Sequence, residues 1–132
     1  MRFFKFLFSG LISGIVLVPL ATISVAQEDS LYVPLYTYRT GPFAPNGVKV
    51  ANGLQAYFET VMKRDGGVEG RVIEWEECEF GYRTDRGVEC YERLKGKKPL
   101  VSNPFSTGLT YKLVPKAPVD KIPVLSMGYG MS

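Results

Sequence analysis

The chain has 132 residues, of which 45% are hydrophobic and 22% charged, with a formal net charge of +3 and no histidine. A charge this small gives no electrostatic basis for binding nucleic acid or an anionic membrane. Without histidine the chain has no Ser-His-Asp or Cys-His catalytic set, and since no other enzyme motif is present, neither an enzymatic activity nor a cofactor is expected.

Residues 1–26 have the pattern of a secretory signal peptide. Arg2 and Lys5 form a short basic start, and an apolar run follows. The small residues Ser24 and Ala26 then occupy the positions that a signal peptidase reads. We expect cleavage before Gln27, export to the periplasm, and a mature chain of 106 residues with a net charge of +1. The alternative is an uncleaved membrane anchor, for which the apolar run is short.

The first half of the mature chain predicts a strand, a helix and a second strand. Residues 31–38 are rich in β-formers, and Pro34 marks this strand as irregular or edge-like. Asn46 is expected to cap a helix with apolar residues at helical spacing from 50 to 61, which Gly66 ends. Residues 71–77 predict the second strand.

Glutamates gather at the end of this second strand. Strand alternation places Glu74 and Glu76 on one face and Glu77 on the other. Glu79 follows two residues later. We interpret the group as a solvated strand edge, the alternative being an acid/base pair.

The second half continues the alternation of helices and strands. Thr84 is expected to cap a second helix that Gly96 closes, and residues 99–103 predict a third strand. A third helix follows, shortened or kinked by Pro115 and Pro118, and a fourth strand is predicted at residues 122–127. The order β-α-β-α-β-α-β is typical of an α/β fold, a parallel sheet with flanking helices.

Ligands of such folds collect beyond the carboxyl ends of the strands. Three polar or glycine-rich stretches are expected to meet there: residues 41–47, 106–108 and 128–130. The hydroxyls of Ser106 and Thr107 with the Gly108 amide would suit a carboxylate, the alternative being that Thr107 only caps its helix. Neither glycine-rich nucleotide-binding motif is present, which disfavours a nucleotide.

Cys78 and Cys90 are the only cysteines. In an oxidising compartment they are expected to form a disulfide between a strand end and the next helix. The alternative is two free buried thiols. Two cysteines without histidine make a poor zinc site, so no metal is expected.

Five motifs occur in the order found in the first lobe of the type I periplasmic binding proteins for branched-chain amino acids and amides, which the chain resembles. They are "TGPFAPNG", "ANGLQAYFETVMKRDGGVEGRVIEWEE", "TDRGVECYERLKG", "STGLTY" and "IPVLSMGYG". The "GG-x-x-G" between helix and strand is a familiar signature of that family. The resemblance covers residues 31–132 and implies a leucine-binding-protein-like domain.

The resemblance implies two lobes that trap an amino acid or amide and deliver it to the membrane permease of an ABC importer. It implies a binding protein rather than an enzyme, and we expect this protein to be a monomer. The chain stops after the fourth predicted strand, so we expect residues 27–132 to be the N-terminal portion of the domain, with the C-terminal part missing. Such a chain alone is expected to bind weakly.

The resemblance also implies roles for particular residues. Thr107 and the Gly108 amide match the position that grips the ligand carboxylate. Gly128 matches a backbone carbonyl at the end of the fourth strand, and Gly130 stands where the family usually has a hydroxyl.

Two further positions bear on the ligand's side chain. Asn46 is the nearest match to a first-loop residue that covers it, and Tyr129 offers a ring or a hydroxyl. These two residues favour a more polar ligand, such as an amide. The alternative functions are the ligand-sensing domain of a receptor with the same lobe architecture, an exported enzyme and a structural module.

Overall fold

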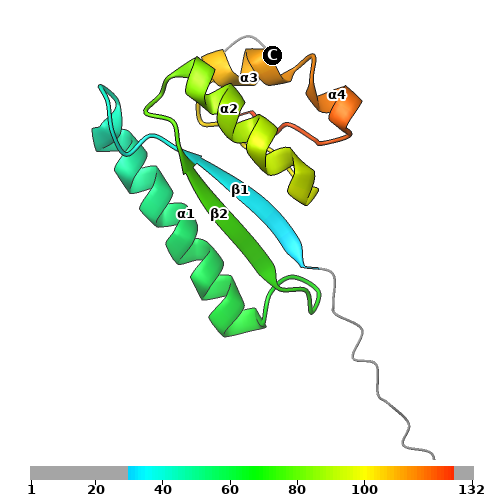
Figure 1. Cartoon of the computed structure of the whole chain (residues 1–132). Helices are drawn as coiled ribbons and strands as arrows, with labels where there is room; N and C mark the ends of the chain where they lie inside the picture. Colours follow the sequence, from blue (N-terminus) through cyan, green and yellow to red (C-terminus); the bar gives the residue numbers. More distant parts are fainter. Residues whose placement is uncertain (1–29, 127–132) are drawn as a thin grey trace, which may run out of the picture.

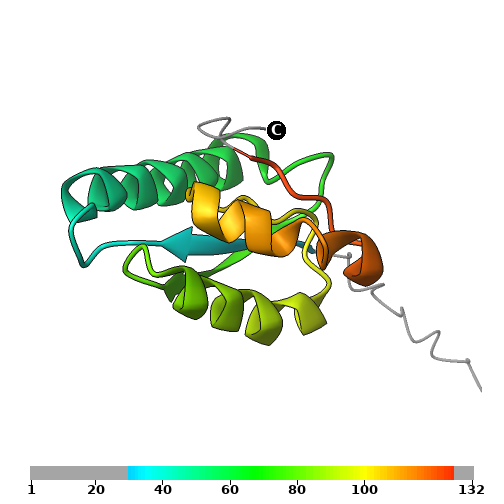
Figure 2. The ribbon, with the colours of Figure 1, turned by 90° about the horizontal axis from the view of Figure 1, so that it is seen from above.

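The structure is a computed structural model that describes residues 30–126, in which two parallel strands lie between helices (Figure 1). Strands β1 (Leu31–Thr37) and β2 (Ile73–Glu79) pair in parallel over their full length. Seen from above, α1 covers one face of the strands and α2 the other (Figure 2). Within residues 30–126 no helix has the length and apolar character needed to cross a membrane. The expected α/β class and the parallel pairing are confirmed for this pair of strands.

Helix α1 (Ala44–Asp65) begins earlier than the sequence predicted. Its N-cap is Phe43, and a proline follows in the first turn, where its missing N–H costs no hydrogen bond. Asn46 therefore lies inside the helix and does not cap it, which corrects the prediction. The helix ends as predicted at Gly66, which has a left-handed backbone with φ of 70°.

Helix α2 (Thr84–Leu94) has Thr84 as its first residue, so Thr84 does not cap it as predicted. The cap position is taken by Arg83, whose side chain makes no capping hydrogen bond. A single 3₁₀ turn, η1 (Lys95–Lys97), follows, so Gly96 lies within a turn rather than closing the helix. The main core fills the space between α2, α3 and the strands. Its buried residues are Tyr36, Tyr38, Cys78, Phe80, Cys90, Tyr91, Leu94, Leu109, Leu113 and Ile122.

The expected effect of the two prolines is confirmed: the third helical segment is divided into α3 (Thr107–Leu113) and α4 (Ala117–Asp120). Helix α3 packs closely on α2, since a Cβ added at Gly87 would lie 2.7 Å from the Leu109 side chain. The Tyr91 hydroxyl donates to Asp120 over 2.8 Å and joins α2 to α4.

The predicted third and fourth strands are wrong as full strands. Within residues 30–126 these segments share one parallel bridge, Ser102 to Val124, and Leu100 donates to the Tyr32 carbonyl over 2.9 Å. Proline explains the short ladder. The backbone groups of a strand point alternately to its two sides, so those of residue 34 point to the same side as those of Tyr32, toward residues 99–103. Pro34 has no N–H to donate to that segment.

The edge-like prediction for Pro34 is confirmed within residues 30–126, because β1 is one of two strands in the sheet and Pro34 faces the side of β1 that has no second ladder. Pro34 is fully buried and lies opposite Glu76 in the register. The buried Tyr36 hydroxyl lies 3.1 Å from the Ser102 hydroxyl and joins β1 to the third segment. Side-chain contact therefore holds this segment beside β1 where the backbone ladder fails.

The predicted disulfide is confirmed. Cys78 at the end of β2 is bonded to Cys90 of α2, with their Cα atoms 5.9 Å apart. The Arg93 guanidinium donates to the Cys78 sulfur over 2.9 Å. The bond fixes α2 to the carboxyl end of β2, close to the loops described next.

Candidate functional site

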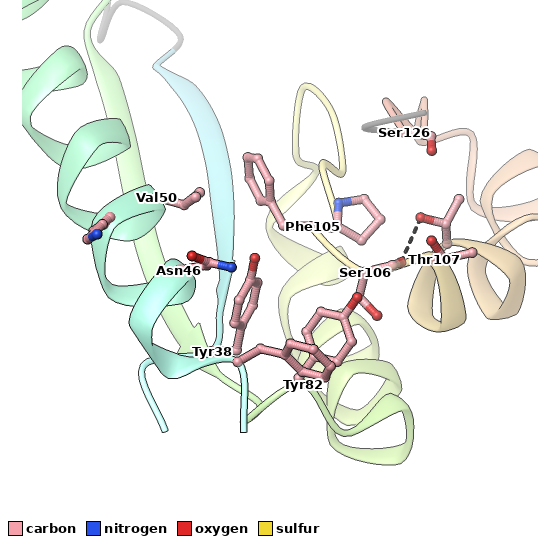
Figure 3. A pocket seen from close by; sticks show the side chains of 12 residues that line it. Tyr38, Asn46, Val50, Tyr82, Phe105, Ser106, Thr107 and Ser126 are labelled. Carbon is pink, nitrogen blue, oxygen red and sulfur yellow. Dashed lines mark hydrogen bonds between the residues drawn. The ribbon is translucent and has the colours of Figure 1, made fainter. Parts of the chain in front are cut away.

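A cleft of about 540 Å³ opens at the carboxyl end of the strands. One wall comes from the first turns of α1 and the other from the segment that leads into α3, as Figure 3 shows for Asn46 and Val50 opposite Phe105, Ser106 and Thr107. The lining residues are Tyr38, Phe43, Asn46, Lys49, Val50, Tyr82, Pro104, Phe105, Ser106, Thr107, Thr110 and Ser126. The cleft lies beyond the carboxyl ends of the strands, where the sequence predicted that a ligand would bind.

Two residues expected to bind ligand, Asn46 and Thr107, line this cleft from opposite walls. Gly108 is exposed and does not line it; a Cβ added there would lie 2.7 Å from the Thr84 hydroxyl, so glycine permits the contact between α3 and α2. Gly128, Tyr129 and Gly130 lie outside the described residues.

The cap of α3 is Ser106, whose hydroxyl accepts a hydrogen bond from the Leu109 amide over 3.3 Å. Thr110 donates its own hydroxyl to the Ser106 carbonyl over 2.9 Å. Thr107 is the first helical residue, so the alternative in which Thr107 caps the helix is wrong. Its half-buried hydroxyl makes no hydrogen bond among residues 30–126 and is able to serve a ligand.

Aromatic rings form much of the remaining lining, and the sequence analysis did not single them out. The Tyr82 ring lies 4.9 Å from the Tyr38 ring, nearly perpendicular to it, and 4.4 Å from the Phe43 ring. Phe105 adds a fourth ring from the opposite wall. Their positions in the chain could have indicated this role, because Tyr38 and Tyr82 each come shortly after a strand ends.

Glu79 holds the two loops that carry three of these rings. Its carboxylate accepts hydrogen bonds from the Arg39 amide, at 2.7 Å, and the Thr40 amide, at 3.1 Å. On the other side it accepts from the Gly81 amide, at 3.0 Å. Burial opposes the charged form, but these bonds outweigh it and hold the pKa of Glu79 below its ordinary range.

Glu77 acts on the face of the strands that α1 covers. The Arg39 guanidinium binds both of its carboxylate oxygens, and the Gln55 amide donates over 2.7 Å. The bond from Arg39 is the main cause that lowers the pKa of Glu77. The interpretation of the glutamates as a solvated edge therefore holds for Glu74 and Glu79, which are exposed, but not for the half-buried Glu76 and Glu77. Although exposed, Glu79 fixes the loop after β1 together with Glu77.

The chain belongs to the periplasmic binding protein family, whose model matches residues 30–132. This is a family of solute-binding proteins and not of enzymes, and it places the protein in the periplasm or outside the cell. Within residues 30–126 no group of acidic or cysteine side chains could hold a metal ion. None of the curated proteins matches the chain.

Solved structures of ABC transporter proteins share the fold. A protein of the Pseudomonas fluorescens group, described as an ABC transporter permease, is 38% identical, with 79% of this chain and 26% of that chain covered and a TM-score of 0.74. A fatty acid ABC transporter substrate-binding protein from Thermomonospora curvata is 26% identical. The match covers 74% of this chain and 25% of that protein, with a TM-score of 0.67.

A third similar structure holds a ligand. The solute-binding protein of an ABC transporter from Rhodopseudomonas palustris BisB5, in complex with 3,4-dihydroxybenzoic acid, is 25% identical, with 76% and 27% covered and a TM-score of 0.64. The chain spans about a quarter of the length of these proteins. This span corresponds to part of one lobe.

Proposed function

We propose that the protein is the solute-binding component of an ABC importer. It captures an amino acid, another small organic acid or an amide in the cleft and delivers it to a membrane permease. The observation that carries this proposal is the Thr107 hydroxyl, which faces the cleft without a protein partner among residues 30–126, on the wall opposite Asn46. A hydroxyl and an amide across a cleft suit a carboxylate or amide group.

The ligands of the relatives support a carboxylate. A fatty acid and 3,4-dihydroxybenzoic acid differ in size and shape, but each carries one carboxyl group. If that group is the shared feature, the hydroxyl-bearing wall around Thr107 is its binding place, and the rest of the cleft selects the body of the ligand. Gly108, Gly128, Tyr129 and Gly130 are proposed to contribute through backbone atoms and the tyrosine side chain.

A second lobe is proposed to complete the site. The cleft is open to solvent, and several lining residues, Phe43 and Asn46 among them, are exposed. A ligand bound to this lobe alone would keep much of its surface in water. We therefore expect the isolated chain to bind its ligand at least about a hundredfold more weakly than the complete protein.

Residues 1–26 are proposed to be a signal peptide cleaved before Gln27. The intact mass of protein recovered from the periplasm tests this directly. A mass that retains these residues would contradict cleavage without contradicting solute binding.

The binding function is tested by calorimetry on the complete protein, with any lobe encoded beyond Ser132 included. A panel of amino acids, amides and aliphatic and aromatic carboxylates is expected to contain a ligand. Thr107→Ala should then weaken binding about tenfold, the usual cost of a lost hydrogen bond to a charged group. Thr60→Ala, an exposed threonine of α1, is the matched control. Unchanged affinity in Thr107→Ala would overturn the assigned role.

A further inference from the structure

We propose that the natural ligand is an aromatic acid without an ammonium group, a benzoate-like or phenylpropanoid-like carboxylate, and not an α-amino acid. This inference rests on the proposed function and names the ligand class of the same cleft. Two independent observations support it: the rings that line the cleft and the charges that face it.

The rings come from three separate segments of the chain. Tyr38 follows β1, Phe43 precedes α1, Tyr82 follows β2, and Phe105 lies before α3. In Figure 3 Tyr38 and Tyr82 lie at the base of the cleft, with Phe105 across from Val50. The edge-on contact of Tyr38 with Tyr82 is a favourable aromatic geometry, and a planar ligand ring between Tyr82 and Phe105 would extend the arrangement.

Tyr82 is held in place before any ligand arrives. Its ring stacks on the fully buried Phe80 at 6.3 Å and 21°, and its backbone is left-handed with φ of 62°. A bulky residue in this conformation is strained, and such strain is characteristic of functional sites. Phe43, in contrast, is 49% exposed beside it. A ring inserted here would cover apolar surface that water now contacts.

The charges that face the cleft are one-sided. Lys49 supplies an ammonium group, Ser106 and Thr107 supply hydroxyls, and no aspartate or glutamate is among the described lining residues. The neighbouring carboxylates of Glu77 and Glu79 are engaged by Arg39, Thr40 and other donors. The carboxylate of a ligand is therefore matched by charge here, whereas an α-ammonium group would meet only neutral acceptors and no carboxylate among the described lining residues.

Two pairs of probes separate the two parts of the proposal. Benzoate and cyclohexanecarboxylate have nearly the same size and charge and differ in aromaticity. Hydrocinnamate and phenylalanine share ring and carboxylate and differ in the ammonium group. In calorimetry on the complete mature protein we expect benzoate to bind about tenfold tighter than cyclohexanecarboxylate. Hydrocinnamate should bind at least about tenfold tighter than phenylalanine.

Matched variants link the preference to this cleft. Tyr82→Leu and Phe105→Leu are each expected to reduce the affinity for benzoate about tenfold. Each should also reduce the ratio between the affinities for benzoate and cyclohexanecarboxylate. Tyr57→Leu changes a ring that is 63% exposed on α1 and should leave both affinities unchanged. Lys49→Gln should weaken both acids equally, with Lys63→Gln on the same helix as its control. Melting temperatures show that each variant is folded.

The outcomes distinguish this inference from the function beneath it. If leucine, isoleucine or an aliphatic amide binds tighter than every ring acid, the aromatic-acid inference is overturned and the solute-binding function stands. If phenylalanine equals hydrocinnamate, the exclusion of the ammonium group is wrong. If no acid, amino acid or amide binds the complete protein, both proposals fall.

Discussion

The carboxylate of Glu79 accepts two hydrogen bonds from Thr40, one from its backbone amide at 3.1 Å and one from its hydroxyl at 2.9 Å. Through this contact the end of β2 holds the loop that follows β1. The same carboxylate also binds the Gly81 amide in the loop after β2, so one side chain joins both loops beneath the aromatic lining.

Replacing this carboxylate should loosen both loops. Glu79→Gln keeps the size of the side chain but leaves several N–H donors without a charged acceptor, at an expected cost of about 1–2 kcal/mol in the free energy of unfolding. Hydrogen exchange at the Arg39 and Thr40 amides should also become faster. Glu74→Gln, in the same strand and exposed, is the control. Unchanged exchange at both amides would show that Glu79 does not hold the loop.

The stability of the protein should fall in acid because of Glu77. Its pKa is lowered in the folded state by Arg39, so its contribution is fully present above the ordinary glutamate pKa of about 4.3. That contribution is lost as the pH falls through the lower folded-state pKa. Urea unfolding at a series of pH values between about 3 and 6 measures how the free energy of unfolding changes with pH. Glu77→Gln should flatten the dependence of the unfolding free energy on pH, and an unchanged dependence would contradict the role assigned to Glu77.

Two glycines of α1 offer a matched pair for packing. A Cβ added at Gly47 would lie 1.9 Å from the Tyr38 carbonyl oxygen, whereas a Cβ at Gly53 would meet nothing within 4 Å. We expect Gly47→Ala to destabilise the fold by at least about 2 kcal/mol because the helix must move away from β1. Gly53→Ala should stabilise it by about 0.5–1 kcal/mol through helix propensity. Thermal unfolding of the two variants checks both signs, and equal effects would contradict the close contact.

The disulfide should contribute measurably to stability. The bond between Cys78 and Cys90 closes a short loop, and its removal by Cys78→Ser with Cys90→Ser is expected to cost about 2–3 kcal/mol. Reductant should lower the melting temperature of the parent protein toward that of the double variant. A double variant with the same melting temperature as the oxidised parent would show that the disulfide does not contribute to stability.

The sequence predicted well those features that depend on local pattern. Both long helices, the first two strands and the left-handed end at Gly66 have periodic or conformational signatures that tertiary packing does not change. The disulfide followed from compartment and cysteine number. Asn46 and Thr107 were placed correctly at the edge because parallel strands end on the same side of a sheet.

The remaining features depend on contacts between distant residues. Pro34 removes the N–H that a third strand would need, and this is visible only when the strand's neighbours are known. The cap of α1 moved because Phe43 and the following proline start the helix before Asn46. Glu79 is exposed, as the sequence indicated, but its role in holding the loop was not predicted, because Arg39 and Thr40 lie about forty positions away in the chain and meet it only in the fold.

The positions of the aromatic residues give the protein two separate optical signals. Trp75, the single tryptophan, packs on Phe58 of α1 at 5.5 Å and is not among the cleft residues. Tyr82 lies between Tyr38 and Phe43 in the cleft itself. The contribution of Tyr82 to near-ultraviolet circular dichroism, isolated as the difference from Tyr82→Leu, is therefore expected to respond to occupancy of the cleft, while tryptophan emission is expected to report the packing of α1 on β2. Titration and unfolding can be followed in unlabelled protein.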